Sequence, residues 1–370
     1  MSTRESTRRS FAKADERGDG GVGLSVRRNN HFVPQMYLQN WGTDNKVFVH
    51  RLLVPHELYP DWERCSIRKT AYIENLYVRI EDGEEYDDFE IDFNSQFETP
   101  TKPVLDKICN DCKLKPEDWQ ILCDYITAQY VRTPSFYSFV AEWGKENVPH
   151  TIDSIFEELK NVKNSDAEKP YYDDNKVLLP VEMEVSLNQN DKQKYLVINT
   201  VIGKNLWLFT INHALLHDSP IKKTVRSLKW SIISAPIGIA WPTCDAPVVI
   251  TRLDKKHNLF ITDGFGYRDR VILFPVSPKK VLWGSQKREI PWRLEADENL
   301  TIQIRGAIVG NAHMYIYSNT EDADVIAIRD RSVDEKVFQE QKEQFNDWYK
   351  KYRNDEAPLL TRKRNIMGTT

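Results

Sequence analysis

Hydrophobic periodicity changes along this 370-residue chain, from mainly helical in the first half to mainly strand-like in the second. A helix is predicted from Pro116, with acidic residues in its first turn, and it is expected to break at Arg132-Thr133-Pro134. Strands are predicted at residues 229–235, 237–241, 247–252 and 270–276. This segregation favours an α+β fold, in which a helix-rich first half packs on a mixed or antiparallel sheet from the second half.

Other segments fit the same scheme. A short helix is expected to begin through Pro34, and alternation predicts a strand at residues 46–52. Helical patterns recur at residues 205–217 and 333–352, whereas residues 300–317 fit a helix or a strand equally well.

We expect three regions along the chain. Residues 1–29 are polar and basic and predict a flexible tail, residues 30–320 form a single α+β domain, and residues 321–370 form a C-terminal helix and a frayed end. The tail could tether the protein to a polyanion such as nucleic acid, but a solvated extension is the simpler interpretation because it has no aromatic or periodic element to dock.

Charge and composition limit the partners and the compartment. Fifty-one basic and 55 acidic residues leave a net charge of −4, so nucleic-acid binding would have to use local basic segments. The apolar runs are too short to span a membrane, and residues 1–30 lack the apolar stretch of a signal peptide. Five scattered cysteines do not form the framework of a disulfide-rich secreted protein, so we expect a cytoplasmic protein with reduced thiols and no membrane partner.

His31 is the first candidate for catalysis. It stands in the block His31-Phe32-Val33-Pro34, where we expect a helix to begin, and an imidazole there could act as a general base or a metal ligand. A histidine that is hydrogen-bonded to the backbone explains the block at least as well.

Asp245 is the second candidate. It lies between Pro242 and Pro247 on a tight connection between two strand-like segments. Its carboxylate could orient a histidine or bind a divalent metal ion, or it could cap its own turn, which is the commonest role of aspartate in such loops.

Gln129 and Arg132 lie one helical turn apart and can share a face. Arg132 could hold a phosphate or a carboxylate with two hydrogen bonds, or it could pair with a buried acid and tie its helix to the core.

Metal and nucleotide motifs are weak or missing. Cys109 and Cys112 form a CxxC pair without a second pair, and His213 and His217 have the i, i+4 spacing of zinc ligands without the glutamate of a metalloprotease. The sequence contains no phosphate-binding loop, no dinucleotide fingerprint and no nucleophile elbow, so the cofactor stays unknown, with a divalent metal ion as one option.

Taken together, five short blocks resemble a microbial family catalogued as domain of unknown function 4238. They are a His-Phe-x-Pro-x-x-Tyr-Leu block (His31 to Leu38), an Asn-x-Tyr step (Asn75, Tyr77), a Gln-x-x-Arg-x-Pro step (Gln129 to Pro134), a Ser-Asp-Asn-Pro turn and a Phe-Pro-Leu-Ser-Pro strand end. The chain departs from the family at Cys244-Asp245-Ala246-Pro247, which keeps the aspartate and proline, and has Val276 for leucine. The resemblance spans residues 30 to about 320 and implies no reaction.

If the blocks converge in space, His31, Asn75, Arg132 and Asp245 would line one polar pocket. The leading hypothesis is then a hydrolase-like effector, for example a nuclease in a toxin or phage-defence setting, with His31 as general base and Asp245 orienting it or holding a metal ion. The alternative is a non-catalytic ligand-binding or adaptor protein in which Arg132 and the proline-rich turns shape a ligand or protein surface. Asn75, Gln129 and Arg132 are then the candidate binding residues. The sequence leaves open whether the protein is an enzyme.

Overall fold

A computed structural model describes residues 26–81, 84–160, 182–189, 194–201, 204–216, 219–256, 258–262, 264–266, 269–287 and 290–346. The basic N-terminal tail lies almost wholly outside these residues. Within them, no helix is both long and apolar enough to cross a membrane.

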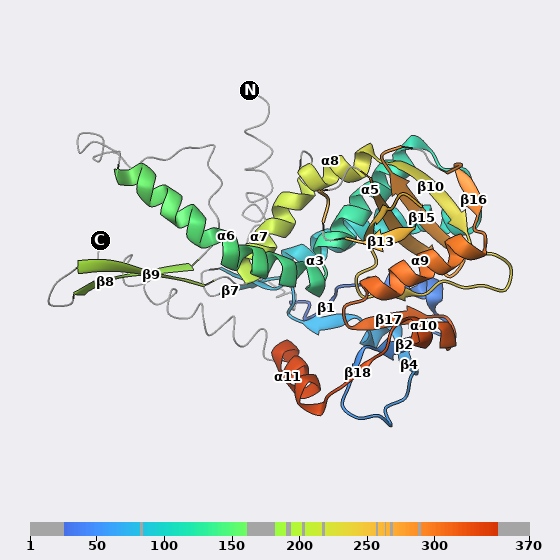
Figure 1. Ribbon diagram of the computed structural model, residues 1–370, viewed down its shortest axis with the longest axis horizontal. Helices are drawn as coiled ribbons and strands as arrows, with labels where there is room; N and C mark the ends of the chain where they lie inside the picture. Colours follow the sequence, from blue (N-terminus) through green and yellow to red (C-terminus); the bar gives the residue numbers. More distant parts are fainter. Residues whose placement is uncertain are drawn as a thin grey trace, which may run out of the picture.

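The centre of the fold is a six-stranded sheet from the second half of the chain (Figure 1). Neighbouring strands run antiparallel except β10 and β16, which are parallel. In spatial order the strands are β13 (Leu259–Ile261), β12 (Val249–Leu253), β14 (Arg270–Ser277), β15 (Lys280–Ser285), β10 (Lys229–Ser234) and β16 (Arg293–Glu295). The predicted mixed or antiparallel sheet is therefore confirmed.

Both faces of this sheet are buried, as strand β14 illustrates. Ile272 and Phe274 join the hydrophobic cluster that contains the helices of the first half, whereas Val271 and Leu273 join a second cluster against helix α9 (Glu298–Asn311). Successive side chains of a strand point to opposite faces, so a strand that is covered on both sides reads as a continuous hydrophobic segment. The sheet is thus the middle of three layers.

The first layer consists of helices, most of them from the first half. They are α3 (Asp88–Asp92), the π-helix η3 (Phe93–Glu98), α4 (Thr99–Cys109), α5 (Pro116–Val131), α6 (Pro134–Lys160), α7 (Lys204–Leu215) and α8 (Pro220–Ser227). α5 begins as predicted, with Pro116 at its first position and the carboxylate of Asp118 accepting the backbone N–H of Lys115 at 2.8 Å. It ends at Val131 with Arg132 as its C-cap, before Pro134 begins α6. The α+β class is confirmed.

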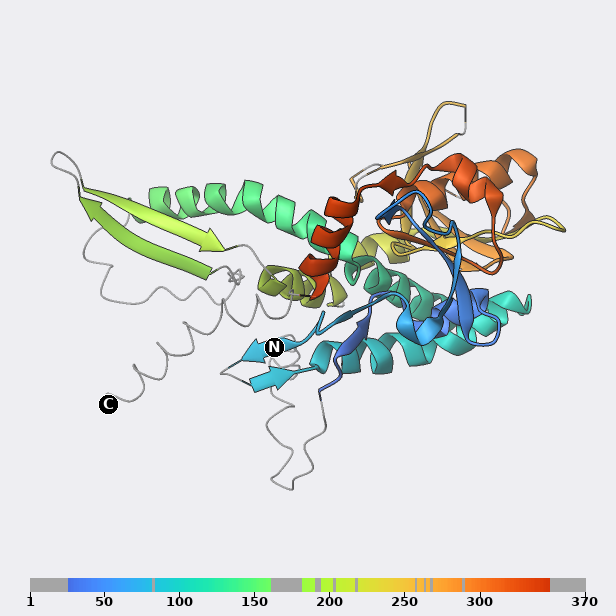
Figure 2. The ribbon, with the colours of Figure 1, turned by 90° about the horizontal axis from the view of Figure 1, so that it is seen from below.

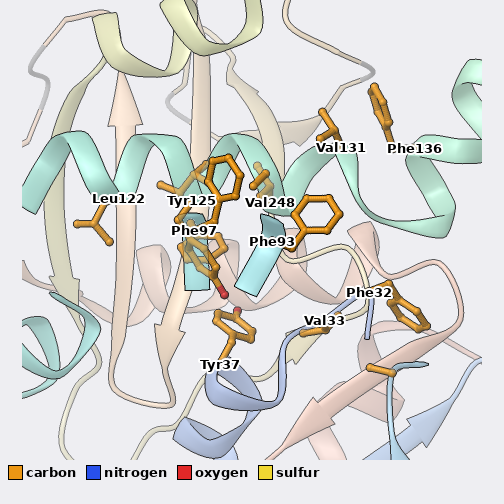
Figure 3. Packing of buried hydrophobic residues seen from close by; sticks show 14 of the residues in the cluster. Phe32, Val33, Tyr37, Phe93, Phe97, Leu122, Tyr125, Val131, Phe136 and Val248 are labelled. Carbon is orange, nitrogen blue, oxygen red and sulfur yellow. The ribbon is translucent and has the colours of Figure 1, made fainter. Parts of the chain in front are cut away.

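The N-terminal segment packs beneath α5. It contains β1 (Asn29–His31), α2 (Gln35–Leu38) and the 3-10 helix η1 (Gln39–Trp41). Figure 3 shows Phe32, Val33 and Tyr37 of this segment below the side chains that project from α5. The hydroxyl of Tyr37 donates to the carbonyl of Pro275 at 2.8 Å, which fixes the segment to β14.

A second, smaller sheet stands beside the main one. Its order is β11 (Thr243–Cys244), β17 (Tyr315–Ser318), β2 (Lys46–Arg51) and β4 (Glu63–Ser66), all antiparallel. Further elements are the 3-10 helix η2 (Ile67–Lys69) and the strand pairs β1 with β5 (Tyr72–Glu74), β6 (Arg79–Glu81) with β7 (Glu84–Tyr86), and β8 (Glu182–Gln189) with β9 (Lys194–Val201).

The chain then passes through α10 (Ala323–Ile328) to β18 (Ser332–Val333), which pairs with β3 (Leu53–Val54). Helix α11 (Glu335–Asn346) follows and lies against β5 and β3 (Figure 2).

Two local expectations are corrected or resolved. The strand predicted at residues 237–241 is wrong, because Ile237, which is 99% exposed, and Gly238, which has a left-handed φ of 85°, form a turn. The ambiguous residues 300–317 are divided between α9 and β17, with α9 ending at Asn311.

Candidate ligand-binding site

His31 ends strand β1, opposite Tyr72 of β5, rather than beginning a helix as expected. Its imidazole is 7% exposed, its ring centroid lies 5.6 Å from that of Tyr72, and its Nε2 has no hydrogen-bond partner among the described residues. Burial lowers the pKa of His31, against the backbone of Arg68, which raises it. The side chain is therefore neutral at pH 7.

Arg132 is buried at the junction of α5 and α6. Its Nη2 donates to the backbone carbonyl of His31 at 2.5 Å, and its Nη1 pairs with the carboxylate of Glu98 at 2.7 Å. The guanidinium lies 4.2 Å from the ring centroid of Phe93 and 5.6 Å from that of Tyr77. The interpretation in which Arg132 pairs with a buried acid and ties its helix to the core matches this arrangement.

Gln129 and Asn75 are also engaged within the protein. Gln129 Nε2 donates to the carbonyl of Phe32 at 2.8 Å. Asn75 has a left-handed φ of 55°, accepts from Arg28 through Oδ1 at 3.1 Å, and accepts from Lys204 through its backbone carbonyl at 2.9 Å. Both side chains therefore help to fix the N-terminal segment in place.

Asp245 is 1% exposed and faces the backbone of the turn before β17. Its Oδ1 accepts the N–H of His313 at 2.8 Å, and its Oδ2 accepts the N–H of Met314 at 2.6 Å. Burial raises the pKa of Asp245, and these backbone hydrogen bonds oppose that rise. Among the described residues, no hydrogen bond joins Asp245 to His31.

Arg132 and Gln129 thus bond to the backbone of the N-terminal segment, whereas Asp245 bonds to the backbone of the turn before β17. Of the five predicted site residues, only Gln129 lines either of the two cavities described below. The expectation that His31 and Asp245 act together on one substrate stays a prediction.

The large cavity has a volume of about 650 Å³ and lies between the smaller sheet, strand β5 and helix α11. Its wall combines tyrosines with basic side chains: Tyr59, Tyr72, Tyr315, Tyr317, Arg51, Lys69 and Lys342. One acidic residue, Glu74, also lines it. Cavities of roughly 300–1,000 Å³ are typical of small-molecule sites.

The basic groups of the large cavity differ in how they are held. Arg51 is fixed by Glu63 at 3.3 Å, and its guanidinium lies 5.2 Å from the ring centroid of Tyr315. Lys69 and Lys342 are exposed and have no ion pair among the described residues. The two lysine charges are therefore available to a ligand.

Tyr317 contributes an uncommitted polar atom to this wall. The residue is fully buried, and its hydroxyl has no hydrogen-bond partner among the described residues. Burial raises the pKa of Tyr317 well above its usual value, so the hydroxyl remains protonated and can donate. A buried hydroxyl without a partner costs free energy.

Two of the recognised motif turns support the wall of the large cavity from behind. Phe32 lines it directly, and His31 contacts its lining residue Tyr72. Asp245 holds Met314 through its side chain and Tyr315 through its backbone N–H at 3.1 Å. The predicted catalytic residues thus position the cavity wall without lining it.

Sequence reasoning missed the residues of the large cavity. One signal was available: alternation in residues 46–52 places Val49 and Arg51 on the same face of β2, and both line the cavity. No such signal predicted that Lys69 and Lys342 would line the same cavity, because they come from distant segments of the chain.

The cysteines are free, including Cys109 and Cys112. No group of three or more histidine, cysteine or acidic side chains in the described part of the chain is arranged to hold a metal ion. His217 of the predicted histidine pair lies outside that part.

Comparison with known proteins places the chain in a family. The family model described as protein of unknown function (DUF4238) matches residues 29–322, which is most of the chain. The chain belongs to this family. No curated protein and no solved structure matches it.

The DUF4238 match ends before α11. The large cavity is therefore lined mainly by the family region, while Phe338, Gln341 and Lys342 are contributed from beyond it. The wall of the large cavity thus combines residues of the matched region with residues of α11.

Proposed function

We propose that the protein is a ligand-binding protein whose large cavity takes an anionic ligand with a planar ring, of which a mononucleotide is the representative. The observation that carries this proposal is that tyrosine rings and two lysines, which have no ion pair among the described residues, surround one cavity of about 650 Å³. The proposal concerns binding, the second of the two functions that the sequence left open.

The charge of the wall favours an anion. Arg51, Lys69 and Lys342 stand against Glu74 within the cavity, and Glu63 offsets part of the charge of Arg51. A phosphate placed between the lysines would gain charge-assisted hydrogen bonds, which are about twice as strong as neutral ones.

The tyrosines favour a planar group beside the anion. Tyr315 and Tyr317 lie with ring centroids 6.3 Å apart and an angle of 24° between their planes, and Tyr59 and Tyr72 belong to the same wall. Stacking of a base on an aromatic side chain contributes roughly 1–3 kcal/mol, and it tolerates different bases. The buried hydroxyl of Tyr317 adds one donor.

Isothermal titration calorimetry with AMP, GMP, adenosine and inorganic phosphate tests the proposal. We expect the nucleotides to bind more tightly than adenosine or phosphate alone, and we expect added salt to weaken binding. Lys69→Ala and Lys342→Ala should each reduce affinity by about fivefold, since an exposed ion pair contributes up to about 1 kcal/mol.

Lys102→Ala is the matched control, because Lys102 is an exposed lysine on α4 that does not line the cavity. Failure of both nucleotides to bind at millimolar concentration would refute the proposal. Equal losses in the control and cavity variants would show that the nucleotide binds elsewhere.

Hydrolysis of the bound ligand is the second candidate function, including the nuclease activity considered from the sequence. The observation in its favour is the neutral imidazole of His31, with an uncommitted Nε2 next to the lining residue Tyr72. Incubation of wild type and His31→Leu with AMP and with single-stranded DNA and RNA, with and without Mg²⁺, tests it. Turnover that is absent in wild type, or unchanged by His31→Leu, would reject His31 as the base.

A further inference from the structure

A second, smaller cavity lies where the end of α5 meets the turn that follows Asp245. It has a volume of about 150 Å³ and is lined by Gln129, Tyr130, Thr133, Ser135, Phe136, Phe139, Ala246, Val248, Ile250, Thr262, Gly264 and Asn311. None of these residues is charged, which sets this cavity apart from the larger one.

Two lining residues each carry a buried polar atom that has no hydrogen-bond partner among the described residues, namely Gln129 Oε1 and Thr262 Oγ1. Gln129 is fully buried, so its carbonyl is withdrawn from bulk solvent. A buried polar atom without a partner costs about 1–3 kcal/mol. An arrangement that keeps two such atoms in one cavity is suited to a ligand that completes their hydrogen bonds.

The orientation of the Gln129 amide is fixed by chemistry. The carbonyl of Phe32 can only accept a hydrogen bond, so the NH₂ group must face it, at 2.8 Å. Oε1 is then the atom left over. The cavity therefore offers an acceptor from Gln129, and the hydroxyl of Thr262 can donate.

Aromatic rings supply another part of the wall. Phe136 and Phe139 have centroids 5.9 Å apart and planes inclined by 30°, and Phe136 also contacts the ring of Tyr130 at 5.1 Å. An apolar cavity of about 150 Å³ in another protein is large enough for benzene. The volume here thus fits one six-membered ring.

From these features we propose that the small cavity is a second binding site, for an uncharged planar ligand with an amide edge. The N–H of that edge donates to Gln129 Oε1, its C=O accepts from Thr262, and its ring packs against Phe136. Uracil and benzamide are the probes that represent this class.

Ligand-observed NMR with uracil and benzamide, on wild type and on Thr262→Val, tests the assignment. Valine keeps the shape of threonine and removes only the hydroxyl. We expect the affinity for both probes to fall by tenfold or more, while the melting temperature of the ligand-free protein stays level or rises because a partnerless hydroxyl has been removed.

Thr251→Val is the matched control. Thr251 is a buried threonine of β12, and its hydroxyl donates to the carbonyl of Val271 at 3.0 Å. This variant should lower the melting temperature and leave probe binding unchanged. Ala246→Asn, which places a larger side chain at a lining position, should weaken probe binding without affecting nucleotide binding in the large cavity.

Absence of binding by both probes at millimolar concentration would overturn the proposal, and so would binding that Thr262→Val leaves unchanged. The test is independent of the large cavity, because Thr262 does not line it. Nucleotide binding could fail while uracil binds here, or the reverse, so the two proposals are separable.

Discussion

Arg132 donates a hydrogen bond of 2.5 Å to the backbone carbonyl of His31, across a sequence separation of 101 residues. The same guanidinium pairs with Glu98 on the π-helix η3. Arg132 therefore joins β1 to the helical layer, and it contacts the backbone of His31 rather than the imidazole.

This relationship predicts unequal effects at the two residues. Arg132→Met should lower the free energy of unfolding by about 3–5 kcal/mol, because it leaves Glu98 without its buried partner. His31→Leu keeps the carbonyl and most of the volume, so its loss should stay below about 1.5 kcal/mol. Urea denaturation measures both, and equal losses would contradict the role assigned to the carbonyl.

The buried hydrogen bonds of Asp245 lead to a second prediction, which compares the stability losses of two aspartate variants. Asp245→Asn leaves only one side-chain oxygen to accept the N–H groups of His313 and Met314, so it should lower the free energy of unfolding by about 1–3 kcal/mol. The matched control is Asp254→Asn. Asp254 likewise accepts backbone N–H groups, including that of Lys256 at 2.7 Å, but it caps its own turn at the surface, where water replaces a lost bond.

Thermal denaturation of Asp245→Asn and Asp254→Asn tests whether burial determines the loss of stability. A loss in Asp254→Asn as large as in Asp245→Asn would show that burial is not the cause. If Asp245→Asn unfolds no more easily than wild type, the capping role of Asp245 is wrong.

Glu90 predicts a dependence of stability on pH. Burial raises its pKa from 4.5 to about 7, although Arg132 opposes the rise, and Oε2 has no hydrogen-bond partner among the described residues. The folded protein therefore binds more protons at this site than the unfolded chain between pH 4.5 and 7, so the contribution of Glu90 to stability falls as pH rises through that window.

Glu90→Gln removes this titration. Relative to wild type, the variant should gain stability between pH 4.5 and pH 8, by on the order of 2–3 kcal/mol if the raised pKa is fully expressed. Glu321→Gln, at an exposed position, controls for the loss of one negative charge. Urea denaturation across this pH range gives the difference in free energy of unfolding between wild type and Glu90→Gln. If that difference does not change with pH, the carboxyl of Glu90 is not the source of the pH dependence.

Local signals in the sequence predicted the elements that depend on nearby residues. The start and end of α5 followed from Pro116, the acidic first turn and Pro134, and these features act within one helical turn. Alternation located β2, and the hydrophobic segment at 270–276 located β14. The prediction of a strand at residues 237–241 was wrong because the hydrophobic pattern carries no information about the left-handed φ of Gly238.

The motif blocks identified the family, and their order along the chain was enough for that. The blocks could not reveal whether the backbone or the side chain of each residue makes the hydrogen bonds. Arg132 and Gln129 bind the carbonyls of His31 and Phe32, and Asp245 binds backbone N–H groups. Every residue has a backbone carbonyl, so a sequence pattern cannot mark one as the partner of a distant guanidinium.

The sequence by itself determined the α+β class, the main helices and strands, and membership of the family, because each depends on periodicity or on short ordered motifs. Tertiary structure alone decided where the cavities lie. The large cavity gathers Arg51, Lys69, Tyr315 and Lys342 from segments separated by up to almost 300 residues. Such an assembly depends on how sheets and helices pack, which no local pattern of residues records.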